Sequence, residues 1–250
     1  MSQPDYPQRI VSLVPSLTEL LFDLGLEDRL AGRTRFCVHP EDRVEAIPII
    51  GGTKNPRVEK IRDARPDWVI ANKEENEKEH VEQIRQFCKV TVTEIHTIEQ
   101  ALNWIEKLGK SAGVSERAHQ LTGEITGLLE RRDIWYPMNA VYYIWKDPWM
   151  SIGGDTYIHD VMNHWGLTNL LSDFTRYPEL PLSDLERLQP ELILLSSEPY
   201  PFKEKHKEEI KEICPSSRIE LVDGEWFSWY GSRMKHVFES LTRWRNSLEE

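Results

Sequence analysis

The stretch 61–71, IRDARPDWVIA, returns in outline 124 residues later as LERLQPELILL at 185–195. Each copy has the pattern of a short helix, a proline that ends it, an acidic residue and an apolar run of strand length. Because both copies carry these signals in the same order, the sequence predicts two similar lobes.

Short apolar runs and amphipathic stretches alternate on either side of these copies, which is typical of α/β organisation. Two helix starts carry capping signals: Ser16 with Glu19 as a capping box, and Asn55 before Pro56. Strands are predicted over 9–14, 67–71, 89–93, 140–145, 192–195 and 218–222. Further helices are predicted over 77–87, 97–110, 204–213 and 232–248, with shorter ones after Asp155 and Ser183.

The middle of the chain has a different pattern. From 114 to 132 the apolar residues keep to one helical face, which predicts a helix of roughly 30 Å at 1.5 Å rise per residue. These residues are Val114, Ala118, Leu121, Ile125, Leu128 and Leu129. We therefore expect an N-terminal α/β lobe over 1–112, a bridging helix over 113–133 and a C-terminal α/β lobe over 134–250.

Composition excludes two classes of protein. The 250 residues include 31 Lys and Arg against 42 Asp and Glu, a net charge of −11, which disfavours a protein that tracks nucleic-acid phosphates. No apolar run approaches the roughly 18 residues that span a bilayer. The first residues show no signal peptide. A periplasmic location is expected if a leader was trimmed, and a cytoplasmic one if Met1 is the native start.

Motifs for catalysis are missing from the sequence. No Gly-x-Gly-x-x-Gly, His-Glu-x-x-His or Cys-x-x-Cys occurs. A Gly-x-Ser-x-Gly pattern stands at 109–113, but it follows a predicted helix and not a strand, so it does not form the strand-to-helix turn of a nucleophile elbow. Cys37, Cys88 and Cys214 are widely separated and odd in number, which favours free thiols over a disulfide framework. Cys37 lies two residues before His39. A cysteine and a histidine this close in a loop are more often chance neighbours than a thiol nucleophile and its base.

Histidines leave a second class of site open. Asp155 and His159 are four residues apart at a predicted helix start and so share a face. Together with His39, His80 or His96 they could chelate a bare divalent metal. No spacing in the sequence brings these histidines together, so ordinary surface and capping roles are the favoured interpretation.

Four of the nine tryptophans fall at strand ends or in loops: Trp145, Trp149, Trp226 and Trp229. Large aromatic side chains are costly to leave in water. They therefore either close the edge of a core or line a ligand cleft.

Several segments together resemble one family. They are RIVSLVPSLTELL at 9–21, GGTKNP at 51–56, RPDWVIA at 65–71, SIGGDTYI at 151–158, LQPELI at 188–193 and DGEWFSWYGSR at 223–233. In this order they resemble the substrate-binding proteins of cobalamin and ferric-siderophore ABC importers, the helical-backbone metal receptors. The resemblance covers about 9–245. It implies two Rossmann-like lobes joined by one long helix, and a monomer that binds its ligand between the lobes without chemistry or cofactor.

The resemblance also implies which residues contact the ligand. Aromatic positions of the family match Phe36, Trp149, Tyr177 and Trp226, and Trp229 lies in the same aromatic loop as Trp226. The cations Arg33, Arg35 and Arg233 are expected to meet anionic groups of a chelate. Thr53 and Asn72 stand where the cobalamin receptors have tryptophans, which weakens the case for cobalamin itself.

Docking on a permease is the last implication. The family places one acidic residue on each lobe, seven before the proline of the repeat. Glu59 matches in the first lobe, whereas Ser183 stands at the second position with Asp184 beside it. We expect Glu59 and Asp184 to contact the permease.

The sequence thus predicts a non-enzymatic binding protein for a corrinoid or ferric siderophore, either part of an ABC importer or a cytoplasmic relative. The alternatives are a protein that binds a bare divalent metal through His and Asp, and an enzyme acting on a small molecule.

Overall fold

The chain folds into two compact units in the computed structural model, which describes residues 6–131 and 133–249. The first contains residues up to Ile95, Glu99–Gly127 and Tyr230–Lys235. The second contains His96–Ile98, Leu128–Trp229 and His236–Glu250. Each unit is described separately below.

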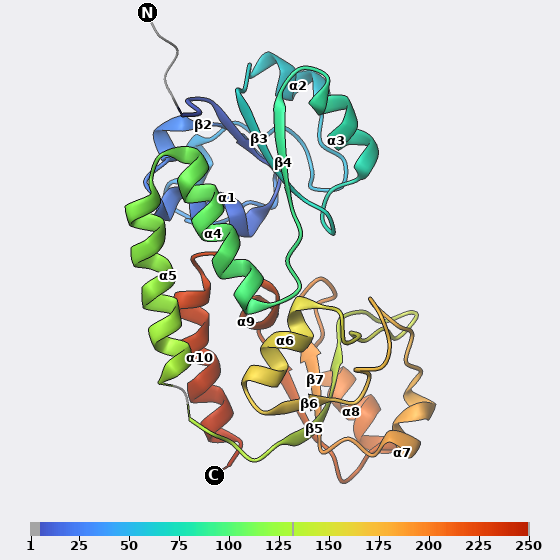
Figure 1. The fold of residues 1–250 in the computed structure, drawn as a ribbon. Coiled ribbons are helices and arrows are strands. Elements are labelled where there is room, and N and C mark those ends of the chain that lie inside the picture. Colours follow the sequence, from blue (N-terminus) through green and yellow to red (C-terminus); the bar gives the residue numbers. More distant parts are fainter. Residues whose placement is uncertain (1–5, 132, 250) are drawn as a thin grey trace, which may run out of the picture. The chain divides into compact units, whose positions relative to one another are not determined.

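The first unit is built on a four-stranded parallel sheet in the order β2-β1-β3-β4 (Figure 1). Its strands are β1 (Ile10–Ser12), β2 (Leu30–Arg33), β3 (Trp68–Asn72) and β4 (Lys89–Thr93). Its helices are α1 (Pro15–Asp23), α2 (Val58–Asp63), α3 (Lys78–Arg85) and most of α4 (Ile98–Ala112) and α5 (Ser115–Glu130), with 3-10 turns η1 (Glu27–Arg29) and η2 (Val44–Ala46).

The second unit repeats this sheet, in the order β6-β5-β7-β8. Its strands are β5 (Met138–Tyr143), β6 (Leu167–Asn169), β7 (Leu192–Ser196) and β8 (Arg218–Val222). Its helices are α6 (Tyr157–His164), α7 (Leu185–Leu188), α8 (Glu204–Ile213), α9 (Glu225–Ser228) and most of α10 (Met234–Ser247), with the 3-10 turn η3 (Leu182–Asp184).

Each sheet has a central strand that is completely buried. All five residues of β3 and all five of β7 are buried, as expected for parallel strands covered on both faces. In the first unit, Ile61 of α2 and Ile84 of α3 pack in one cluster with Val69. In the second unit, Leu185 of α7 and Ile210 of α8 pack in the same way with Ile193. The prediction of two similar α/β lobes is confirmed.

The repeat extends to the backbone that links helix to strand. Arg65 and Gln189, one residue before each proline, both adopt left-handed backbone angles, with φ of 48° and 46°. The acidic residue after each proline then binds the sheet. The carboxylate of Asp67 accepts hydrogen bonds from the backbone N–H of Gln8 and Arg9, and that of Glu191 accepts one from Asn139. The repeated Pro-acidic pair thus ties the start of β1 or β5 to its neighbouring strand.

The long helix is present as α5, and the division between the units falls inside it, after Gly127. Within the first unit α5 packs closely on α4. A Cβ built on Gly109 would lie 2.3 Å from the Cβ of Ala118, so the two helices approach where no larger side chain fits. Thr122 also donates a hydrogen bond to Glu106 at 2.6 Å. The lobe boundaries predicted from the sequence stay a prediction.

Local capping signals gave the least accurate predictions. No capping box forms at Ser16, because α1 begins at Pro15 and its N-cap, Val14, has no side-chain bond. Glu19 is held by a distant arginine instead. Asn55 does not cap α2, which begins at Val58 after Arg57. The short edge strands β2 and β6 were not predicted, since three or four residues carry too little periodicity.

Helix length and hydropathy bear on membrane insertion. Among the described residues, no helix combines the length and the apolar character needed to cross a bilayer.

Candidate functional site

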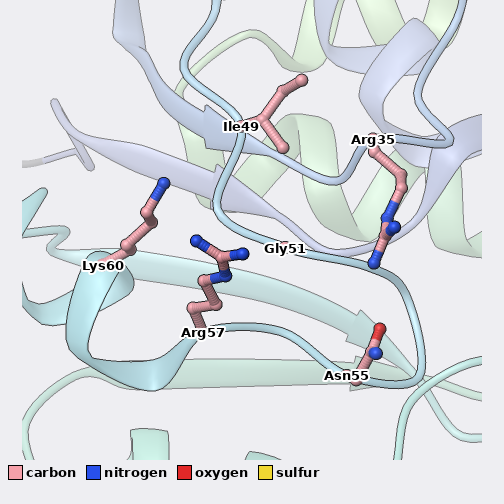
Figure 2. Close-up of a pocket in the computed structure, with 6 residues that line it drawn as sticks. All are labelled: Arg35, Ile49, Gly51, Asn55, Arg57 and Lys60. Carbon is pink, nitrogen blue, oxygen red and sulfur yellow. The ribbon is translucent and has the colours of Figure 1, made fainter.

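A cationic cavity lies in the first unit, lined by Arg35, Ile49, Gly51, Asn55, Arg57 and Lys60. Its volume is about 330 Å³. Figure 2 shows the side chains of Arg57 and Lys60 extending toward the Ile49–Gly51 segment, and Arg35 extending toward the turn that carries Asn55. We call these six residues the cationic cavity.

The backbone of the 49–57 segment shapes this cavity. Gly51 has a φ of 133°, and a Cβ there would lie 2.8 Å from the backbone nitrogen of Arg57. Only glycine therefore allows the chain to close on itself at this point. The N–H of Arg57 donates to the carbonyl of Ile50 at 2.8 Å, and the N–H of Arg35 donates to Gly51 at 2.9 Å. The Gly51–Pro56 motif thus places both arginines beside one turn.

Three cations of the cavity have no acidic partner in the part of the chain that the structure describes. Over residues 6–131 and 133–249, no ion pair joins Arg35, Arg57 or Lys60 to a carboxylate. Arg57 and Lys60 are three residues apart at the start of α2, so they lie on the same side of the helix. A group of like charges without counter-ions in a concave surface concentrates anions from solution.

Exposed apolar side chains accompany the cations. Phe36 and Ile49 are 55% and 47% exposed. The guanidinium of Arg35 lies 5.6 Å from the centre of the Phe36 ring. Ile49 is itself part of the cavity. The first unit therefore presents apolar area next to positive charge, a combination that suits a ligand with an apolar body and anionic substituents.

Arg33 has a different environment from Arg35. It is buried, and its guanidinium donates to the carbonyls of Val44 at 2.8 Å and Cys37 at 3.0 Å. These bonds hold the 34–44 loop in place. The N–H groups of Arg33 are thus bonded to the loop in this structure, and the expected contact of Arg33 with a ligand stays a prediction.

Arg233 also has a partner within the first unit. Its Nε and Nη2 atoms donate to the two carboxylate oxygens of Glu19 at 2.8 and 2.7 Å. Both side chains are mostly buried, with 18% and 11% exposed. This bidentate pair attaches the Tyr230–Lys235 segment to α1, and the ligand role of Arg233 stays a prediction beside it.

In the second unit, Trp149 packs at the edge of the core. Its ring is stacked on Phe202 at 5.5 Å and meets Tyr143 edge-on at 5.0 Å. Lys146 lies over the same ring at 4.8 Å. These contacts place Trp149 at the edge of the core, and its contact with a ligand stays a prediction. Trp145, 40% exposed, is the more accessible aromatic of this loop and was not among the predicted contacts.

The remaining aromatic candidates are half-buried and lie in the second unit. Trp226 is 6.4 Å from Trp244, and Tyr177 has the guanidinium of Arg176 at 5.7 Å from its ring. Trp229 donates from Nε1 to Glu198 Oε1 at 3.0 Å. Their contact with a ligand stays a prediction.

Glu198 sits where β7 ends and holds the α9 segment. Ser228 and Trp229 both donate to its Oε1 atom at 3.0 Å. Burial raises the pKa of this carboxyl above its ordinary value, the two hydrogen bonds oppose the shift, and Glu225 and Asp223 add to it. Because the folded protein binds this proton more tightly than the unfolded chain, the carboxyl stabilises the fold at low pH.

This shift predicts a pH dependence of stability. The stabilisation should be complete below the carboxyl's unfolded pKa and lost as the pH rises through the raised folded pKa. Glu198→Gln keeps an oxygen acceptor for Trp229 but cannot titrate. We expect its free energy of unfolding in urea to fall less than that of the wild type between pH 4.5 and pH 8. If the free energy of unfolding changed equally with pH in both proteins, the raised pKa of Glu198 would be contradicted.

The two docking candidates lie on equivalent elements. Glu59 is exposed on α2, and Asp184 is half-buried at the end of η3, just before α7. Each element precedes the left-handed residue and proline of its repeat. Permease contact stays a prediction for both.

The side chains that a bare-metal site or a thiol-dependent enzyme would need do not come together in the described residues. Within the described part of the chain, no group of three or more His, Cys, Asp or Glu side chains is placed to hold a metal ion. Cys37 is buried and burial raises its pKa, which disfavours the thiolate that a nucleophile requires. All three cysteines are free thiols, as expected.

Sequence reasoning missed most of the cationic cavity. Of its six residues only Arg35 was predicted as a ligand contact. The available signal was the Gly51–Pro56 motif followed by cations at 57 and 60, one turn apart. Ile49 and Asn55 carry no such signal, because only the turn brings them to the cavity.

Comparison with known proteins gives three findings. The sequence profile described as "Periplasmic binding protein" matches residues 10–215. An uncharacterized ABC transporter substrate-binding lipoprotein of Bacillus subtilis is 27% identical over 208 residues, which are 75% of this chain and 63% of that protein, somewhat under two thirds of its length.

Solved structures show the same fold. The periplasmic vitamin B12 binding protein BtuF of Vibrio cholerae superposes with a TM-score of 0.83 at 19% identity, over 99% of this chain and 100% of that one. A periplasmic heme binding protein from Pseudomonas aeruginosa gives 0.80 at 21% identity, over 94% and 91%. These likenesses confirm the two-lobed α/β fold.

Proposed function

Because this chain belongs to the periplasmic binding protein family, we propose that it captures a metal chelate, a corrinoid or a ferric chelate, for an ABC importer. The family match confirms the expectation of a binding protein rather than an enzyme. The relatives' names support the ligand class: one is a vitamin B12 binding protein, another a heme binding protein. The Bacillus subtilis relative, an ABC transporter lipoprotein, supports the importer.

The observation that carries the proposal is the surface of the first unit where apolar and cationic side chains meet. Phe36 and Ile49 offer exposed apolar area, and Arg35 lies 5.6 Å from the Phe36 ring and lines the same cavity as Ile49. Corrin and porphyrin chelates have an apolar ring with polar or anionic substituents at the rim. Such a ligand buries its ring on the apolar side chains and its substituents on the cations.

A bare divalent metal is the weaker candidate. It needs three or more hard or borderline donors converging on one point. Residues 6–131 and 133–249 contain no such group, whereas the cavity collects cations, which repel a metal ion.

Titration with chelates tests the proposal. Iron protoporphyrin, cyanocobalamin and a ferric siderophore are each added while tryptophan fluorescence and visible absorbance are recorded. We expect at least one to quench fluorescence and shift its absorption bands with a Kd of about 1 μM or lower. Phe36→Ala should weaken that binding by about tenfold, since it removes exposed stacking area.

The matched control is Phe174→Ala in the second unit, because Phe174 is 56% exposed, as much as Phe36. It should bind like the wild type. No response to any chelate, together with a rise in melting temperature with Zn²⁺ or Mn²⁺, would favour the bare-metal function.

A further inference from the structure

The cationic cavity gathers basic side chains although the protein as a whole is acidic. The protein has eleven more acidic than basic side chains, yet three basic ones line this cavity. Glu59, between Arg57 and Lys60 in sequence, is exposed, does not line the cavity, and forms no ion pair with another described residue. All three cations are exposed, so water and salt screen part of their mutual repulsion, and an anion bound among them would offset the rest.

The donors in the cavity suit an oxyanion. Two guanidinium groups offer planar pairs of N–H donors that match carboxylate or phosphate oxygens, and Lys60 adds a mobile ammonium. Asn55 adds an amide at the same turn, where a Cβ on Gly52 would lie 2.2 Å from its Oδ1. Nonpolar Ile49 completes the wall.

Size limits what the cavity accepts. About 330 Å³ is near the lower end of the range for pockets that enclose a whole drug-sized ligand. It accommodates a substituent and its linker rather than an entire corrinoid or porphyrin. The ring of the chelate would then lie on Phe36 and Ile49, with one anionic arm inside.

We infer that Arg35, Arg57 and Lys60 form a subsite for an oxyanion arm of the bound chelate and thereby select chelates that carry an anionic arm over chelates that carry none. The inference rests on the proposed function and adds the charge of the substrate to it. The arm is a carboxylate, as on a porphyrin rim, or a phosphate, as in the nucleotide tail of a corrinoid. Both offer oxygens to the same donors, and a binding comparison separates them.

The test compares iron protoporphyrin with its dimethyl ester, which keeps the ring and loses both carboxylate charges. Cyanocobalamin serves as the phosphate-bearing ligand. Each is titrated into the wild type and into Arg57→Gln/Lys60→Gln. We expect the double variant to bind the carboxylate or phosphate ligand about 10- to 100-fold more weakly, a loss of the size expected for charge-assisted hydrogen bonds. It should bind the ester as the wild type does.

A charge-matched control removes two cations elsewhere in the same unit. Arg62→Gln/Lys78→Gln lowers net charge equally, and neither residue lines the cavity. It should bind every ligand within about twofold of the wild type. Protection by citrate in a thermal melt, present in the wild type and lost in Arg57→Gln/Lys60→Gln, gives a readout that needs no chelate.

The outcomes separate the two proposals. If chelates bind but the ester and the acid bind equally well to both proteins, the subsite is wrong and the proposed function stands. If no chelate binds, the proposed function fails, and citrate protection lost in the double variant would still support an oxyanion site. If neither esterification nor citrate distinguishes the double variant from the wild type, the inference is overturned.

Discussion

Arg233→Met is expected to lower the free energy of unfolding by about 3–5 kcal/mol, as removal of one partner from a buried ion pair does. The change leaves Glu19 charged and mostly buried, without the two hydrogen bonds of 2.8 and 2.7 Å that now satisfy it. It also releases the Tyr230–Lys235 segment from α1. Urea denaturation followed by circular dichroism measures the loss.

Two further variants distinguish the cause. Glu19→Leu/Arg233→Met should recover a large part of the loss, because an apolar pair of similar size leaves no buried charge. Arg85→Met removes an exposed pair with Glu82 and should cost about 0–1 kcal/mol. A stable Arg233→Met protein with weakened chelate binding would instead assign Arg233 to the ligand, as the sequence alone predicts.

Arg245→Ala is expected to cost about 3–5 kcal/mol in the second unit. Its side chain is fully buried and donates to the carbonyls of Trp165 at 3.0 Å and Tyr136 at 2.7 Å. The guanidinium also lies 5.6 Å from the Trp135 ring. The carbonyl of Trp165, a buried residue, loses its donor away from water, which costs about 1–3 kcal/mol. The substitution also removes the ion pair with Glu249 and the packing of the arginine stem.

The same helix provides the control. Arg243 is exposed two residues earlier on α10 and donates only to Ser240 among the hydrogen bonds of the described chain. Arg243→Ala should change the free energy of unfolding by less than about 0.5 kcal/mol. Burial lowers the pKa of Arg245, but its guanidinium stays charged at neutral pH. Arg245→Lys should therefore keep the charge and still lose stability, because one ammonium cannot donate to both carbonyls in a planar fork.

Much of the secondary structure could be predicted because its signals are local. The ranges 89–93, 204–213 and 218–222 agree with β4, α8 and β8 at both ends. Predictions of helix starts were less accurate where the expected capping side chain binds a residue far away in the sequence. Glu19 has the spacing of a capping residue, yet Arg233, 214 positions away, binds it more strongly than a helix N–H would.

The candidate site was harder to predict for the same reason. Arg33, Arg35 and Arg233 look alike in the sequence, and their charge together with the family resemblance marked all three as ligand contacts. In the structure Arg33 binds loop carbonyls, Arg233 binds Glu19, and Arg35 lines a cavity with two cations that were not predicted. Side-chain type does not reveal whether a donor is already used.

The sequence by itself determined that the chain forms two similar α/β halves with a long helix between them. Hydropathy periods of strand and helix and the repeated proline are set by neighbouring residues, so they can be read locally. Only the tertiary structure decided which positive charges have partners and which remain available to an anion. That depends on residues far apart in the chain, such as Glu19 with Arg233, and on the turn at Gly51 that gathers Arg35, Arg57 and Lys60.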